Sequence, residues 1–171
     1  MRRFRSRSAE RDYERSNLIL ELDYRPTSGT CRLAQKLLQI DPARRGPLSQ
    51  RLLDALADEL KVPRLRLHFH DKPQKHKVED GRLTYKEYAH YDPEDGITVY
   101  NKTAVRQKYL APKSYLDTIV HEFLHHLDYE LLKLNHTYHT QGFYSRLGDL
   151  MGKLQGKRAP QMELFGPQFR P

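Results

Sequence analysis

Apolar residues recur at helical spacing in four stretches of the chain. This spacing predicts one helix over 31–40 and a second over 47–62, where leucine occupies every fourth position between two prolines. The clearest pattern covers about 112–134, where the large apolar residues form one stripe along the predicted helix. A last helix is predicted over 140–156, with a threonine at its start that can cap it.

The middle of the chain alternates apolar and polar residues with the period of β-strands. Leucine and phenylalanine face one side of a strand predicted over 64–70, and arginine and histidine face the other. A second, tyrosine-rich strand is predicted over 83–91, and Asp95-Gly96 predicts a turn into a third over 97–101. The segment 71–81 is charged and turn-like. Helices on both sides of a short meander predict an α+β fold, with a small antiparallel or mixed three-stranded sheet packed on helices.

Basic residues are concentrated at the two ends of the chain. Its 171 residues include 30 Lys and Arg against 22 Asp and Glu, a net charge of +8. Residues 1–15 hold six arginines against three acidic residues, and 153–171 hold four basic residues against one, so each end carries +3. We therefore expect poorly ordered basic tails around a single domain over 16–152. Such tails can bind nucleic acid or an acidic partner weakly.

Composition excludes several classes of protein. No apolar run approaches the roughly 18 residues of a transmembrane helix, and 1–15 lack the apolar segment of a secretory signal. Cys31 is the only cysteine, so no internal disulfide can form, and a zinc site built from several cysteines is excluded. We expect a cytoplasmic protein without membrane contacts, in which any metal is bound by histidine and carboxylate.

The long predicted helix contains the sequence His121-Glu122-Phe123-Leu124-His125, an HExxH motif. Residues four apart lie one above the other on a helix, so the two imidazoles can approach one cation. Both face away from the apolar stripe. Glu122 lies beside them, where it can hydrogen-bond a metal-bound water as a general base. The motif predicts zinc binding.

A catalytic zinc site usually has three protein ligands, so a third is required. His139 is favoured because it follows the predicted helix, and a second element can bring it back to complete a tetrahedron. His136 and Asp128 stay open as alternatives, and Asp128 can instead accept a hydrogen bond from an imidazole. His68 and His70 share one face of a predicted strand and can bind metal together, although that face is more simply the polar side of the strand.

The motif and the later run His139-Thr140-Gln141-Gly142-Phe143 resemble the SprT-like zinc metalloprotease domain family. That family pairs HExxH with a later histidine followed four residues on by phenylalanine, and the similarity covers roughly 48–152. Two features differ: Thr140 stands where the family usually has glycine, and the cysteine-rich zinc ribbon of many members is absent.

The resemblance implies a zincin-like domain with His121, His125 and His139 as Zn²⁺ ligands, Glu122 as catalytic base, and Phe143 packed behind the third ligand. The expected activity is zinc-dependent cleavage of a peptide or protein substrate. The alternative is a non-catalytic zinc-stabilised domain whose basic tails bind nucleic acid or an acidic partner.

Cleavage of a peptide also requires a group that stabilises the oxyanion and a surface that holds the substrate. Tyr100, Tyr138 and Tyr144 are candidates for the first role because they lie near the motif residues in sequence. The strand predicted over 97–101 is a candidate for the second, because an extended peptide can pair with the edge of a sheet.

Overall fold

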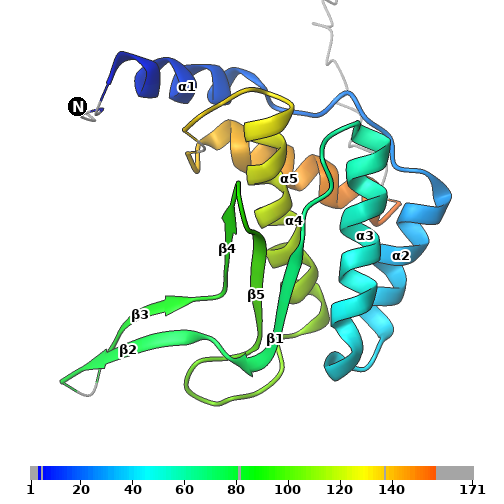
Figure 1. Ribbon diagram of the computed structural model, residues 1–171, viewed down its shortest axis with the longest axis vertical. Helices are drawn as coiled ribbons and strands as arrows, with labels where there is room; N and C mark the ends of the chain where they lie inside the picture. The colour runs from blue at the N-terminus through cyan, green and yellow to red at the C-terminus, as the bar shows by residue number, and fades with distance from the viewer. Residues whose placement is uncertain (1–3, 5, 81, 137, 157–171) are drawn as a thin grey trace, which may run out of the picture.

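The computed structural model describes residues 4, 6–80, 82–136 and 138–156 (Figure 1). The helices of this part are α1 (Arg7–Leu18), α2 (Ser28–Gln39), α3 (Arg45–Leu60), α4 (Pro112–Glu130) and α5 (Gln141–Leu154), with a 3-10 turn, η1 (Pro42–Arg44), before α3. The strands are β1 (Leu67–Pro73), β2 (Lys75–Glu79), β3 (Arg82–Glu87), β4 (Ala89–Asp92) and β5 (Gly96–Lys102). The predicted α+β class is confirmed.

Capping explains where the two helices of the C-terminal half begin. The Thr140 hydroxyl accepts a hydrogen bond from the Phe143 N–H at the start of α5. Pro112 opens α4, where a missing backbone N–H costs nothing. α4 ends at Glu130, four residues before the predicted end, and Lys133 then adopts a positive φ of 53°, which a right-handed helix does not accommodate.

Three strands form a mixed sheet in the order β1-β5-β4, as the sequence predicts in outline. β1 is parallel to β5, and β4 is antiparallel to it. Every residue of β5 except its last is buried, because β5 has a strand on each side and helices beneath it. The central strand therefore links the sheet to the helical core.

The described residues contain five strands, whereas the sequence predicts three. β2 and β3 pair as an antiparallel hairpin within a region predicted as a turn-like segment, 71–81, and one strand, 83–91. The second prediction joins β3 and β4, which are separate and belong to different sheets. β2 is mostly charged, and its pairing rests on backbone hydrogen bonds, so the pattern of apolar residues does not reveal it.

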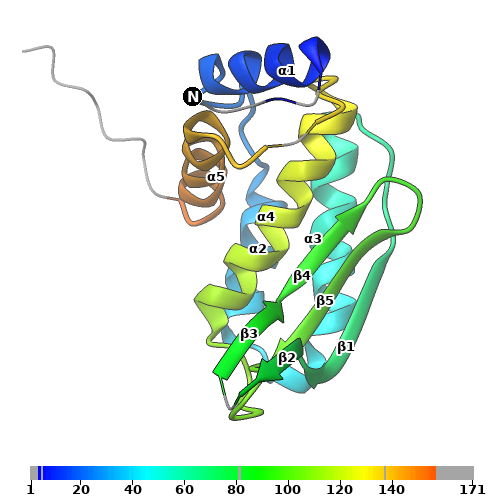
Figure 2. The ribbon, with the colours of Figure 1, turned by 90° about the vertical axis from the view of Figure 1, so that its left-hand side faces the viewer.

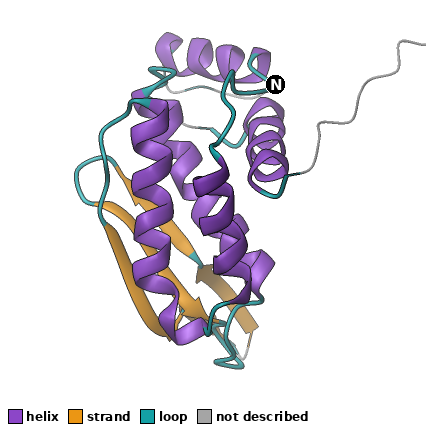
Figure 3. Ribbon diagram, turned by 90° about the vertical axis from the view of Figure 1, so that its right-hand side faces the viewer, coloured by secondary structure: helices purple, strands orange, loops and turns teal. Residues whose placement is uncertain are grey.

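The helices form two layers beside the mixed sheet. α3 and α4 pack against the sheet (Figure 2), and α2 packs on α3 and α4. Figure 3 shows the molecule from the opposite side, with helices in front of the sheet. α5 packs on α4 and α2. The core between these elements includes the fully buried side chains Leu37, Leu52, Leu56, Ile97, Val99, Leu116, Ile119, Val120 and Phe123.

Most of the predicted N-terminal tail is helical where the structure describes it, because Arg7–Leu18 forms α1 across one end of the molecule (Figure 1). Ala9, Asp12 and Ser16 are its buried residues. Two of these three are polar and are buried through hydrogen bonds, which an apolar pattern cannot reveal. The three arginines of α1 are matched by three acidic residues in the same helix.

The predicted C-terminal tail begins inside α5. Lys153 and Leu154 end this helix, and the Lys153 ammonium donates to the Leu22 carbonyl oxygen at 2.6 Å. Residues 157–171 lie outside the described residues. None of the described helices has the length and apolar character needed to cross a bilayer.

Gly96 begins β5 with a φ of 101°, and a Cβ at this position would lie 2.2 Å from the Arg66 carbonyl oxygen. We expect Gly96→Ala to lower the free energy of unfolding by about 2 kcal/mol or more, because the left-handed backbone and the close approach both oppose a side chain. Urea denaturation followed by circular dichroism measures this change.

Gly148→Ala is the matched control, because Gly148 lies within α5 and a Cβ there meets no heavy atom within 4 Å. Alanine favours a helix interior, so this variant is expected to raise the free energy of unfolding by about 0.5–1 kcal/mol. Equal effects of the two substitutions would contradict the close approach of β5 to Arg66.

Candidate metal centre

α4 presents different chemistry on two of its sides. Leu116, Val120 and Phe123 are fully buried in the core. His121 and His125 lie one helical turn apart on another side, with ring centroids 5.0 Å apart. The regular helix therefore fixes the spacing of two imidazoles.

His139 lies in the connection between α4 and α5, and its imidazole joins this pair. Its Nε2 lies 2.9 Å from the Nε2 of His121 and 2.9 Å from the Nε2 of His125. The ligand atoms of the three residues all lie within 4.8 Å of one another. In the part of the chain that the structure describes, this is the one group of three such side chains that can hold a metal ion.

The three nitrogens suit a transition-metal cation. Zinc–nitrogen bonds of about 2.0–2.1 Å in a tetrahedron separate two nitrogens by roughly 3.4 Å. The nitrogens that lie 2.9 Å apart need to separate by roughly 0.5 Å to reach that geometry. Three imidazoles leave the fourth tetrahedral position for water or a substrate oxygen.

Loss of solvation keeps the three imidazoles neutral, although His139 stays exposed on one side. This loss lowers the pKa of His121 to about 4, and the neighbouring His139 adds to this shift. It lowers the pKa of His125 to about 3, with contributions from the other two rings. Burial also lowers the pKa of His139. At neutral pH the cluster therefore offers free lone pairs, the state in which histidine binds metal.

Phe143 supports all three rings from beneath. Its ring centroid lies 4.9 Å from His121, 4.6 Å from His125 and 5.1 Å from His139, and its side chain is fully buried. The Nδ1 of His125 is buried and has no hydrogen-bond partner among the described residues. Packing against Phe143, rather than a hydrogen bond to Nδ1, therefore orients the His125 ring.

Glu122 follows His121 on α4, and its side chain is only 8% exposed. Burial raises its pKa to about 7, while a backbone hydrogen bond from Tyr91 opposes the shift and the charge of Glu87 adds to it. The carboxyl group therefore lies between α4 and β4. A carboxyl with a pKa near neutrality can exchange a proton in either direction.

The other two proposed third ligands have different partners. The His136 Nδ1 lies 3.1 Å from Asp12 Oδ2 of α1. Asp128 accepts two hydrogen bonds from Arg146, at 2.8 and 3.0 Å, and both side chains are fully buried. Neither His136 nor Asp128 belongs to the cluster of imidazoles.

Three further histidines also have partners outside the cluster. The His68 Nε2 lies 3.1 Å from Asp95 Oδ1, and the His70 ring stacks on Tyr100. His126 contacts the Pro63 carbonyl oxygen through Nε2. The described residues therefore hold no metal group built on His68 and His70.

Of the three tyrosines proposed for the oxyanion, Tyr144 lies beside the imidazoles. Its ring centroid is 5.9 Å from that of His139, and its side chain is exposed. Tyr138 packs against Tyr13, and Tyr100 stacks on His70. Of these three tyrosines, Tyr144 is therefore the one whose ring lies next to the cluster.

The strand predicted to accept a peptide, 97–101, is not an edge strand, because β5 pairs with β1 and with β4. The outer strand next to α4 is β4. Tyr91 pairs with Ile97, whose N–H donates to Arg66 on the other side of β5. In an antiparallel ladder, the Tyr91 backbone groups then point away from β5, toward the open edge beside Glu122.

The sequence reasoning missed the groups that support this site. Arg146 of α5 is fully buried, pairs with Asp128 of α4, and also donates to the carbonyl oxygens of Ser16 and Ile19. The apolar patterns give no signal for the pair, because Asp128 and Arg146 lie beside the apolar stripes of their helices and do not interrupt them. The contact with α1 had no signal either.

Comparisons with protein-family models, with curated proteins and with solved structures found no match to this chain.

We expect His139→Ala to weaken binding of Zn²⁺ by the full-length chain by at least about tenfold, because it removes one of three nitrogen donors. Competition titration against a chromophoric chelator measures the dissociation constant.

His68→Ala is the control, since His68 contacts Asp95 and lies outside the cluster. It should leave the dissociation constant unchanged. Equal weakening by both substitutions would show that zinc binds elsewhere on the chain.

Proposed function

We propose that this chain is a zinc-dependent peptidase-like hydrolase in which His121, His125 and His139 hold the metal and Glu122 is the general base. The observation that carries the proposal is the meeting of three neutral imidazole nitrogens, two of them on the helix that also carries the buried carboxyl group of Glu122. A site that only stabilised the fold would commonly have four protein ligands, whereas a three-histidine site leaves one position for a reactant.

In this mechanism, Glu122 carries the proton from the attacking water to the leaving group. Zinc held by the three imidazoles would polarise a scissile carbonyl and lower the pKa of a bound water. The Glu122 carboxylate accepts a proton from the attacking water and delivers it to the departing amine. The three imidazoles stay neutral throughout, so they do not compete for this proton.

The substrate in this proposal is an extended peptide. β4 is an outer strand of the sheet beside Glu122. The Tyr91 N–H already donates to Glu122, and the other outward-facing backbone groups of β4 can pair with a further strand. Tyr91 lies on this strand, and the ring centroid of Tyr144, on α5, lies 6.5 Å from that of His121. Backbone pairing would hold peptides of varied sequence, with side-chain preference set by the residues on either side of the edge.

The resemblance to the SprT-like family supports the same activity. It rests on the HExxH motif, on His139 and on Phe143, whose ring contacts all three imidazoles. The difference at Thr140, where the family usually has glycine, has a local reason, because the Thr140 hydroxyl caps α5. A zincin-like catalytic domain is therefore part of this proposal.

We expect Glu122→Gln to lower the rate of hydrolysis of fluorescein-labelled casein by about 10²–10⁴-fold, because an amide cannot accept the proton. The bound zinc should stay at one equivalent, since Glu122 is not a ligand. Fluorescence release gives the rate, and atomic absorption gives the metal content.

Glu130→Gln is the control on the same helix, because Glu130 pairs with Lys133 and is not a member of the cluster. It should retain full activity. Unchanged hydrolysis by Glu122→Gln would contradict the assigned base, and a wild-type chain that binds zinc but cleaves nothing would favour the non-catalytic alternative.

A further inference from the structure

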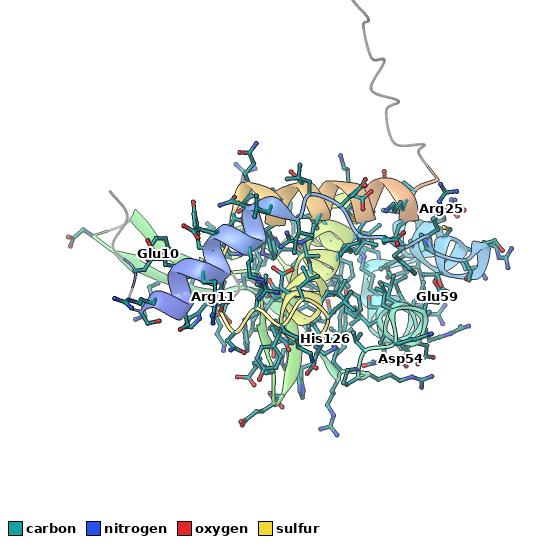
Figure 4. The ribbon with its side chains drawn as sticks, turned by 90° about the horizontal axis from the view of Figure 1, so that it is seen from above. Glu10, Arg11, Arg25, Asp54, Glu59 and His126 are labelled. Carbon is teal, nitrogen blue, oxygen red and sulfur yellow. The ribbon has the colours of Figure 1, made fainter. Side chains whose placement is uncertain are left out.

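The position of the third histidine, His139, depends on a part of the chain that lies outside the HExxH motif. His121 and His125 have their spacing fixed by α4, whereas His139 lies in an irregular connection outside any helix or strand. The residues around His139 are held mainly by α1, which approaches α5 beside the end of α4 when seen from above (Figure 4).

Asp12 of α1 holds the first part of this connection. Its Oδ2 accepts a hydrogen bond from the backbone N–H of His136 at 3.2 Å. The same oxygen lies 3.1 Å from the His136 Nδ1. Asp12 is almost fully buried, so its carboxylate is shielded from water on the α1 side, while the His136 side chain stays partly exposed. One turn further, the Arg15 guanidinium donates to the Leu132 carbonyl oxygen.

Ser16 of α1 holds the residue next to the third histidine. Its hydroxyl lies 2.8 Å from the Thr140 hydroxyl in a buried contact. The same Ser16 hydroxyl accepts a hydrogen bond from Arg146, which pairs with Asp128 on α4. Thr140 immediately follows His139, so this chain of bonds connects α4, α5 and α1 at the third imidazole.

The backbone of α1 also packs directly on the first turn of α5. A Cβ at Gly142 would lie 1.9 Å from the Ser16 carbonyl oxygen, so the two helices can approach this closely only with glycine at this position. The requirement for glycine two residues after Thr140 follows from α1, and not from the imidazoles themselves.

We propose that α1 is the positioning element for His139, so that docking of α1 on α5 and binding of metal by the three histidines stabilise each other. The proposal rests on the metal site of the proposed function. When α1 is docked, the His139 imidazole is held near the pair on α4. When α1 is released, the connection loses its bonds to Asp12 and Ser16, and a site of two imidazoles remains.

Coupling of this kind is reciprocal. If docked α1 strengthens metal binding by a given factor, bound metal must strengthen the docking of α1 by the same factor. Residues of α1 that contact no imidazole should therefore respond to zinc. A protein or ligand that captured α1 would in turn weaken the metal site and lower the activity.

The test is a titration of the full-length chain with Co²⁺, whose visible absorption reports the number and geometry of its ligands. Ser16→Ala removes the hydroxyl between Arg146 and Thr140 while keeping a good helix former in α1. We expect it to weaken Co²⁺ binding by about 10–100-fold and to lower the intensity of the tetrahedral bands, as for other residues that orient a metal ligand.

Ser49→Ala is the matched control. Ser49 of α3 is also a fully buried serine. Its hydroxyl contacts the hydroxyl of Tyr115 on α4 and does not contact the imidazoles. It should lower stability in the same way but leave the Co²⁺ affinity and spectrum unchanged. If both variants weaken Co²⁺ binding equally, the effect is general destabilisation and the proposal is wrong.

Hydrogen–deuterium exchange of the wild-type chain tests the proposal without any substitution. Saturating zinc should slow amide exchange in residues 9–18 as well as around His139. Unchanged exchange in α1, or a Ser16→Ala variant with wild-type Co²⁺ affinity and spectrum, would overturn the positioning role. If Ser16→Ala fails to fold, Asp12→Asn replaces it, with a weaker loss of the same sign. A wild-type chain that binds neither Co²⁺ nor Zn²⁺ would overturn the proposed function itself.

Discussion

The close approach of three neutral imidazoles is the constraint on which the candidate site depends. Each neutral ring has one N–H and one lone pair. The three nitrogens, with the His139 Nε2 2.9 Å from each of the other two, therefore cannot all be satisfied by hydrogen bonds to one another. Packing must hold them together until a cation binds. Phe143 supplies that packing, and the buried pair of Asp128 and Arg146 holds α4 against α5, the two helices joined by the connection that carries His139. Breaking such a pair leaves an uncompensated buried charge, which makes the arrangement hard to relax.

Burial acts on the acid–base groups of the site in two directions at once. It disfavours the charged form of every group, so the histidines lose protons while the Glu122 carboxyl gains one. A bound cation would favour the carboxylate and return its pKa toward the usual range. The same enclosed environment thus prepares both the metal ligands and the proton acceptor, and the charge of the metal would complete the adjustment.

The part of this arrangement that follows a regular period could be predicted from the sequence. The apolar stripe of α4 and the four-residue spacing of its histidines predict both the helix and the two imidazoles that share one side of it. The supporting contacts could not be predicted. α1 is buried through Asp12 and Ser16, whose burial depends on partners more than a hundred residues away. The β2–β3 hairpin is likewise charged, and the central place of β5 depends on pairing between distant segments, which local patterns do not encode.

The most direct test of the account is the coordination of zinc in the reconstituted full-length chain. X-ray absorption spectroscopy distinguishes imidazole nitrogen from oxygen ligands and counts both. The account predicts one zinc per chain with three imidazoles and one oxygen, and the loss of one imidazole in His139→Ala. Zinc bound by two imidazoles in the wild-type chain, or an unchanged spectrum in His139→Ala, would contradict it.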